Sequence, residues 1–78
     1  MKYAVVSYYV GETGDTELWL YDTEDDAKEA LNRLWEQSYN LALDDENFDE
    51  DNSDHEDYFA VVAWKDELYR YFEVVKQN

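Results

Sequence analysis

The sequence predicts an α+β domain of the order ββαββ, in which one amphipathic helix covers one face of a four-stranded, mostly antiparallel sheet. Two observations lead to this fold class. Short runs of β-branched and aromatic residues lie on either side of turn-like segments, and one central stretch has apolar residues at helical spacing. Because a chain of 78 residues has no room for a second core, we expect residues 1–78 to form a single domain.

The first two strands are predicted near the N-terminus. Residues 2–10 carry apolar or aromatic side chains at both odd and even positions, so this strand is apolar on both faces. Residues 11–15 contain both glycines of the chain, and a second β-like run follows at residues 16–21. A short glycine-containing loop between two such runs predicts a β-hairpin.

The central helix has a well-defined predicted start. Asp22 and Thr23 are residue types that cap helix N-termini. The three carboxylates at residues 24–26 would then lie in the first helical turn, where negative charge complements the helix dipole. From Ala27 to Ala42, apolar residues recur at i, i+3, i+4 and i+7, and polar residues take the other face. We expect an amphipathic helix that lies on the sheet.

A second pair of strands is predicted near the C-terminus. Residues 58–64 and 68–75 are rich in aromatic and β-branched side chains, and the three residues between them are short enough for a hairpin. The first and last strands are apolar on two faces, which suits central positions in the sheet. Other strand orders satisfy the same alternation, so the sequence leaves the order open.

The composition is acidic but not that of a disordered chain. The chain has 21 acidic and 6 basic residues and a formal net charge of −15, which disfavours direct binding to nucleic acid or to an anionic membrane. Apolar residues make up 45% and aromatic residues 18%, whereas disordered acidic segments are poor in both. We therefore expect a folded core with an acidic surface, and basic partners.

The most acidic part of the chain is residues 44–57, predicted to be a loop or a frayed helix end. Nine of its fourteen positions are carboxylates, and no Lys or Arg occurs between Arg33 and Lys65. The net charge exceeds the magnitude of about 2 to 8 that keeps a small domain soluble, which suggests a use in binding. The predicted partner-binding carboxylates are Asp44, Asp45, Glu46, Asp49, Glu50, Asp51, Asp54, Glu56 and Asp57, with Glu24, Asp25 and Asp26 as a second patch.

The sequence offers little for catalysis or for a cofactor. His55 is the one histidine, cysteine is absent, and no nucleophile elbow or phosphate-binding glycine loop is present. Residues 45–56 carry oxygen-bearing side chains at several of the ligand positions of a 12-residue EF-hand loop. They do not match it at the sixth position, where Glu50 replaces the required glycine, and a strand-like run follows where an EF-hand has a helix. We expect a protein that is not an enzyme, has no cofactor and has no dedicated metal site.

In size, charge and aromatic-rich β/α composition, the chain resembles the small, very acidic DNA-mimic inhibitors that phages and other mobile elements encode, among them anti-CRISPR and antirestriction proteins. The runs MKYAVVSYYV, DTEDDAKEAL and YFAVVAWKDELYRYFEVV also resemble short phage proteins. The resemblance implies a non-enzymatic inhibitor that binds the basic nucleic-acid-binding surface of a host defence nuclease, such as a Cas effector or a restriction complex, with anti-CRISPR activity favoured. The resemblance assigns no site residues by position. Because the sequence has no stretch near 18 apolar residues and no signal-peptide-like apolar run, we expect a soluble, cytoplasmic protein without membrane attachment, in the host cell if a phage encodes it.

Two alternatives remain open from the residues. One is a structural or regulatory interaction module that forms a homodimer or binds another protein through an aromatic sheet face, because one helix covers only one face of a sheet. The other is an acidic antitoxin that neutralises a basic toxin, which would share the electrostatics of a DNA mimic. Candidates for the uncovered face are some of Tyr3, Tyr8, Tyr9, Trp19, Tyr21, Tyr69 and Tyr71.

Overall fold

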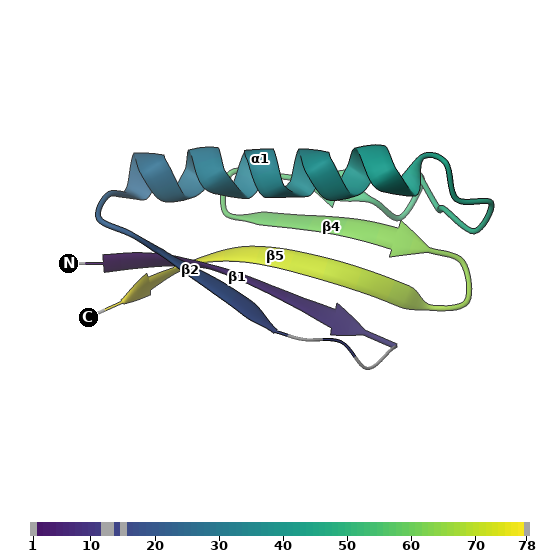
Figure 1. The fold of residues 1–78 in the computed structure, drawn as a ribbon, viewed down its shortest axis with the longest axis horizontal. Coiled ribbons are helices and arrows are strands. Elements are labelled where there is room, and N and C mark those ends of the chain that lie inside the picture. The colour runs from purple at the N-terminus through teal and green to yellow at the C-terminus, as the bar shows by residue number, and fades with distance from the viewer. Residues whose placement is uncertain (1, 12–13, 15, 78) are drawn as a thin grey trace.

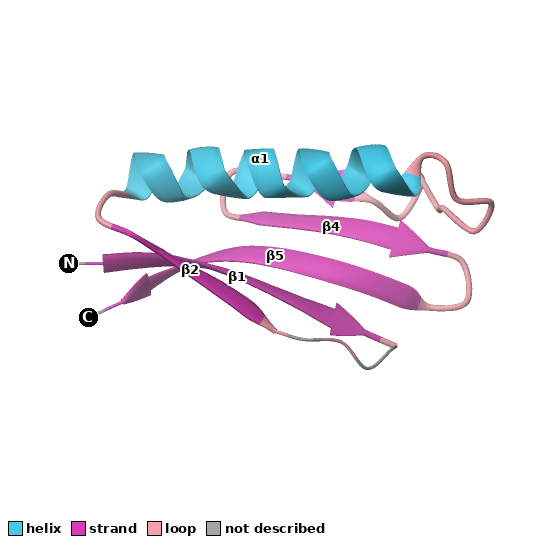
Figure 2. Cartoon of the chain, viewed as in Figure 1, coloured by secondary structure: helices cyan, strands magenta, loops and turns pink. Residues whose placement is uncertain are grey.

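In the computed structural model, which describes residues 2–11, 14 and 16–77, one helix lies across one face of a five-stranded sheet (Figure 1). Figure 2 shows the helix and the sheet as two separate layers. The strand order is β2-β1-β5-β4-β3, and every neighbouring pair is antiparallel. The elements in chain order are β1 (Lys2–Val10), β2 (Glu17–Tyr21), α1 (Glu24–Ala42), β3 (Asp54–His55), β4 (Phe59–Trp64) and β5 (Leu68–Gln77).

The predicted α+β class with one helix is confirmed, but the predicted number of four strands is wrong. The fifth strand, β3, lies inside residues 44–57, which the sequence analysis treated as a loop or a frayed helix end. It pairs with β4 at the edge of the sheet, with Asp54 opposite Val61 and His55 opposite Ala60. A strand of two residues within a charged run has too few positions to show an alternation of apolar and polar residues, so no sequence pattern predicts it.

The first and last strands occupy the interior of the sheet. β1 pairs along its whole length with β5, from Lys2 opposite Gln77 to Val10 opposite Tyr69. β2 pairs with the outer side of β1, as the predicted hairpin requires. Residues 12–13 and 15 of the predicted loop between β1 and β2 lie outside the described residues.

The helix begins where the sequence predicts. The Thr23 side chain accepts a hydrogen bond from the backbone N–H of Asp26 at 3.1 Å, which caps the first turn. At the other end, the backbone N–H of Leu43 donates to the carbonyl of Tyr39. The buried side chains of the helix are Ala27, Ala30, Leu31 and Ala42.

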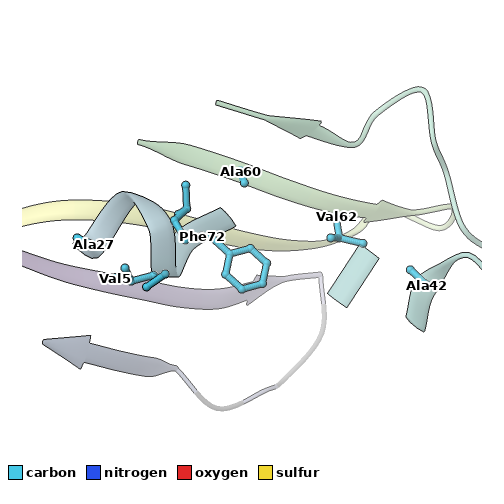
Figure 3. Close-up of a cluster of buried hydrophobic side chains, with 8 residues drawn as sticks. Val5, Ala27, Ala42, Ala60, Val62 and Phe72 are labelled. Atoms are coloured by element: carbon cyan, nitrogen blue, oxygen red, sulfur yellow. The ribbon is translucent and has the colours of Figure 1, made fainter. Parts of the chain in front are cut away.

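The core lies between α1 and the inner strands (Figure 3). Phe72 of β5 is its largest fully buried side chain, and Leu31 of α1 is the next. Tyr3, Trp19 and Tyr21 pack against this cluster from the helix-covered face of β1 and β2. The buried residues of the cluster are Val5, Ala27, Ala30, Leu31, Ala42, Ala60, Val62 and Phe72.

A partly buried arginine links the sheet to the helix. The Arg70 guanidinium donates to the hydroxyls of Ser7 at 3.0 Å and Ser38 at 3.1 Å, and it lies over the rings of Tyr9 and Phe72. Ser7 is only 1% exposed, so its hydroxyl depends on this contact. Arg70 therefore satisfies the buried Ser7 hydroxyl within the sheet and joins the sheet to the helix through Ser38.

Candidate acidic binding surface

Residues 44–57 fold back along the free side of β4 instead of projecting into solvent. The backbone N–H of Lys65 donates to the carbonyl of Asn47 at 2.6 Å, and that of Asp49 donates to the carbonyl of Ala63 at 3.0 Å. Between these bonds, Phe48 forms an isolated β-bridge with Trp64. The first half of the segment is thus fixed to the backbone of the sheet.

The second half is held in the same way. The Ser53 hydroxyl accepts a hydrogen bond from the backbone N–H of Ala63 at 2.9 Å and donates to the carbonyl of Asp49 at 2.9 Å. β3 then continues the sheet, and the backbone N–H of Glu56 donates to the carbonyl of Phe59 at 2.7 Å. These contacts give the acidic segment a defined backbone path.

Four aromatic rings anchor the segment to the helix, and we call them the aromatic clamp: His55, Trp35, Tyr39 and Phe48. The His55 and Trp35 rings stack with centroids 4.8 Å apart, Trp35 and Tyr39 are 4.7 Å apart, and Tyr39 meets Phe48 edge-on at 5.2 Å. The Trp35 indole also donates to the carbonyl of Val61 at 3.0 Å. None of the sequence predictions included this arrangement, although two aromatic residues four apart on a helix and a single Phe inside an acidic run are its signals.

The C-terminal end of the acidic segment meets the start of α1. The Tyr58 hydroxyl donates to the Glu24 carboxylate, and this hydrogen bond raises the pKa of Tyr58 above its ordinary value. Lys28 lies 3.9 Å from the Asp57 carboxylate and 5.3 Å from the centre of the Tyr58 ring. The structure thus joins one residue of the second predicted patch, Glu24, to the predicted loop carboxylates.

The other two residues of the second patch point elsewhere. Residues on a helix are rotated by about 100° per position, so Asp26 lies on the opposite flank of α1 from Glu24 and Lys28. Asp25 projects from the side of α1 away from the sheet, because it is about 160° from the buried Ala27. We therefore define the acidic edge as the nine carboxylates of residues 44–57 together with Glu24, and exclude Asp25 and Asp26.

The acidic edge extends along the length of the helix. It starts where α1 ends and finishes where α1 begins, and a helix of 19 residues is about 28 Å long at 1.5 Å per residue. That length equals about eight steps of 3.4 Å, the axial distance between phosphates along one DNA strand. Among the described residues, Asp57 is the one member of the acidic edge that lies within 4 Å of a Lys or Arg nitrogen.

Within the described residues, no three His, Asp or Glu side chains are grouped so that they could hold a metal ion. The Ser53 hydroxyl, which would be the ninth position of the EF-hand-like reading, is engaged in the contacts that fix the segment to β4.

The face of the sheet away from α1 is not covered by any described element, and we call it the open face. Of the candidate aromatic residues, Tyr8, Tyr69 and Tyr71 lie on it, whereas Tyr3, Trp19 and Tyr21 pack toward the helix. Tyr9 also lies on the helix side, under Arg70. The apolar and aromatic residues of the open face are Ala4, Val6, Tyr8, Val10, Leu18, Leu20, Phe59, Val61, Ala63, Tyr69, Tyr71 and Val75.

No family model, curated protein or solved structure matches this chain. Among the described residues, the one helix is too polar to cross a membrane. The acidic edge and the open face are the two surfaces whose residues and geometry point to binding.

Proposed function

We propose that this protein is a non-enzymatic inhibitor that uses its acidic edge to occupy the basic, nucleic-acid-binding surface of a host defence nuclease in the host cytoplasm. A CRISPR effector is the favoured target and a restriction complex the second. The observation that supports the proposal is the acidic edge itself, which consists of nine carboxylates on a segment fixed along β4 and of Glu24 on α1. It follows the helix over about 28 Å, and one of its ten carboxylates has a described cationic neighbour.

The fixed path matters for affinity. A flexible acidic tail would lose conformational freedom on binding, and this loss would weaken the complex. Here the bonds to β4 and the aromatic clamp already order residues 47–56, so little further ordering is required. A net charge of −15 would also steer the protein toward a basic groove and accelerate association at low salt.

The test begins with recovery of the target. Immobilised protein is incubated with a lysate that contains CRISPR and restriction effectors, at low and at moderate salt, with and without competing duplex DNA. We expect one nuclease to be retained at low salt and released by DNA or by moderate salt, because an interface between charges is screened. A captured basic toxin would indicate the antitoxin function instead.

Variants then locate the site on the protein. Glu46→Lys, Glu50→Lys and Glu56→Lys together reverse three exposed carboxylates of the acidic edge whose side chains form no hydrogen bond or ion pair within the described residues. The control is Asp25→Lys with Glu29→Lys and Glu36→Lys, which changes the net charge equally but on the solvent side of α1.

We expect the edge variant to bind the nuclease about 10- to 100-fold more weakly and to lose inhibition, while the control stays within a few-fold of the parent. Circular dichroism checks that both variants are folded. Full inhibition by a folded edge variant, or equal loss in both variants, would contradict the acidic edge as the site.

A further inference from the structure

We propose that the open face binds the open face of a second copy of this chain, so that two sheets pack into a sandwich with the two helices outside. This inference is independent of the proposed target and concerns a different surface. Its basis is an apolar face over which no described element packs, in a domain whose other surfaces are rich in charge.

The open face has an aromatic centre. Tyr8 and Tyr71 lie opposite each other on β1 and β5 and stack with ring centroids 5.4 Å apart. Phe59 lies 5.6 Å from Tyr71 on one side, and Tyr69 lies 6.0 Å from it along the same strand. Clusters of large rings of this kind are enriched at the centres of protein interfaces, because they bury much area at a small loss of side-chain freedom.

Aliphatic residues extend the face beyond this centre. Leu18 and Leu20 of β2 are 56% and 59% exposed, and Val10 and Val75 are 45% and 39% exposed. Single exposed apolar side chains are ordinary on a protein surface. Here Leu20 and Val75 lie on either side of Ala4, and Val10 lies opposite Tyr69 of the aromatic centre. They make one continuous apolar surface with the aromatic centre.

The size of the face fits a symmetric dimer. Each residue of a sheet covers about 16 Å², from a spacing of about 4.8 Å between strands and a rise of about 3.4 Å per residue. The four longer strands therefore present about 500 Å² on the open face, and two copies would bury about 1,000 Å² in total, which is the lower bound for a specific interface. A two-fold axis through the aromatic centre would place each tyrosine cluster against its equivalent.

The distribution of charge permits this contact despite the net charge of the chain. Among the described side chains of β1, β2, β4 and β5, the charged ones on the open face are Lys2 at one corner and Glu73. Lys2 is bonded to Asp22 at 2.7 Å, and Glu73 lies beside Tyr8. The acidic edge lies along β3, β4 and the helix. Its members at the margin of the open face are Asp54, opposite Val61, with Asp49 and Glu56, which are bonded to Ala63 and Phe59. Face-to-face packing therefore leaves most carboxylates outside.

Among the described side chains, Glu73 is the one charged residue at the interior of the face. It sits between Val6 and Phe59 on the neighbouring strands. Burial raises the pKa of Tyr8 above its ordinary value, and the Glu73 carboxylate adds to this effect. In the dimer, the hydroxyl of Tyr8 is the available donor to this carboxylate, and burying the carboxylate would cost affinity.

Sedimentation velocity over a range of protein and salt concentrations tests the proposal. The monomer has a mass of 9.4 kDa. We expect a species of twice that mass whose fraction rises with protein concentration and also with salt, because salt screens the repulsion between two copies of the same charge. Binding through the acidic edge would have the opposite salt dependence, so the two surfaces are separable in one set of measurements.

A matched pair of variants locates the interface. Leu18→Gln with Leu20→Gln removes exposed apolar side chains from the open face, and Leu41→Gln with Leu43→Gln does the same on and just after α1. All four leucines are at least half exposed, so both variants should fold. We expect the dimer Kd to rise at least about tenfold in the first variant and to remain unchanged in the second.

A second measurement uses Glu73. Glu73→Gln removes one charge from the open face, and Glu29→Gln removes one from the helix, so the two variants have equal net charge. We expect the dimer Kd of Glu73→Gln to be several-fold lower than that of Glu29→Gln. The proposal would be overturned if the protein is monomeric at every protein and salt concentration, or if both leucine pairs weaken the dimer equally. Equal effects of Glu73→Gln and Glu29→Gln on the dimer Kd would also overturn it.

Discussion

The imidazole of His55 stacks on the indole of Trp35 with ring centroids 4.8 Å apart and an angle of 30° between the planes. The same indole donates to the carbonyl of Val61, which lies on β4 next to β3. One helical side chain thus contacts both the acidic segment and the strand on which that segment folds. The position of the acidic edge therefore depends on packing between aromatic rings as well as on backbone bonds.

Phe48→Ala should loosen the acidic segment without unfolding the domain. Phe48 is half-buried and meets Tyr39 edge-on, so its truncation should lower the free energy of unfolding by about 1 to 3 kcal/mol. Amide hydrogen exchange should become faster in residues 47–57, while β1 and β5 remain protected. Leu41→Ala, which truncates an exposed leucine, is the control and should leave the exchange pattern unchanged. Unaltered exchange in the Phe48 variant would mean that the backbone bonds alone hold the segment.

Arg70→Met should destabilise the fold much more than loss of one surface charge would. The substitution leaves the Ser7 hydroxyl, which is 1% exposed, without its donor, and it also removes the bond to Ser38. We expect the free energy of unfolding to fall by about 2 kcal/mol in urea titrations. Arg33→Met changes the net charge equally at an exposed position of α1 and should cost less than about 0.5 kcal/mol. Similar values for the two variants would show that Arg70 has no structural role.

The contact between Tyr58 and Glu24 should make stability depend on alkaline pH. The hydrogen bond from the phenol to the carboxylate raises the folded-state pKa of Tyr58 above the value in the unfolded chain. Its stabilisation is thus fully present below the ordinary tyrosine pKa of about 10 and is lost as the pH rises through the higher folded-state pKa. Tyr58→Phe and Glu24→Gln should each reduce this loss, measured as the free energy of unfolding at several pH values, whereas Asp25→Asn should not.

Gly11→Ala should lower the melting temperature. Gly11 has a φ of +95°, and a β-carbon there would collide with the carbonyl oxygen of Glu67 in the turn between β4 and β5. Strain of this kind costs about 1 to 3 kcal/mol, which corresponds to a drop of at least about 5 °C in a domain of this size. Thr16→Ala, at an exposed position just before β2, should change the melting temperature by less than about 2 °C. An unchanged melting temperature for Gly11→Ala would show that the turn can move away.

Local sequence patterns predicted most of the fold. The alternation in residues 2–10 and the cap at Thr23 placed β1 and the start of α1 at their observed positions. β3 could not be predicted, since its pairing depends on the edge of β4 and not on its own residues. The sequence also could not decide which aromatic residues face the helix, because β1 is apolar on both faces and the packing of Phe72 and Val5 against α1 makes the choice.

The candidate site was predicted as a set of charges but not as a shape. Charge counting identified residues 44–57, and it treated Glu24, Asp25 and Asp26 alike. The structure separates them, because helical geometry turns Asp26 away while Tyr58 draws Glu24 to the end of the acidic segment. Contacts between residues far apart in sequence determine this arrangement, and no local pattern encodes them.

The pairing of β1 with β5 has a consequence for the order of events during synthesis. β1 leaves the ribosome before the other described strands and its partner β5 leaves after them, although Lys2 lies opposite Gln77 in the folded sheet. Until then, the nascent chain can form the β1–β2 hairpin and α1, both of which are marginal in isolation. The interior of the sheet therefore assembles only after translation of β5, and the charge of residues 44–57 helps to keep the unfinished chains apart in the meantime.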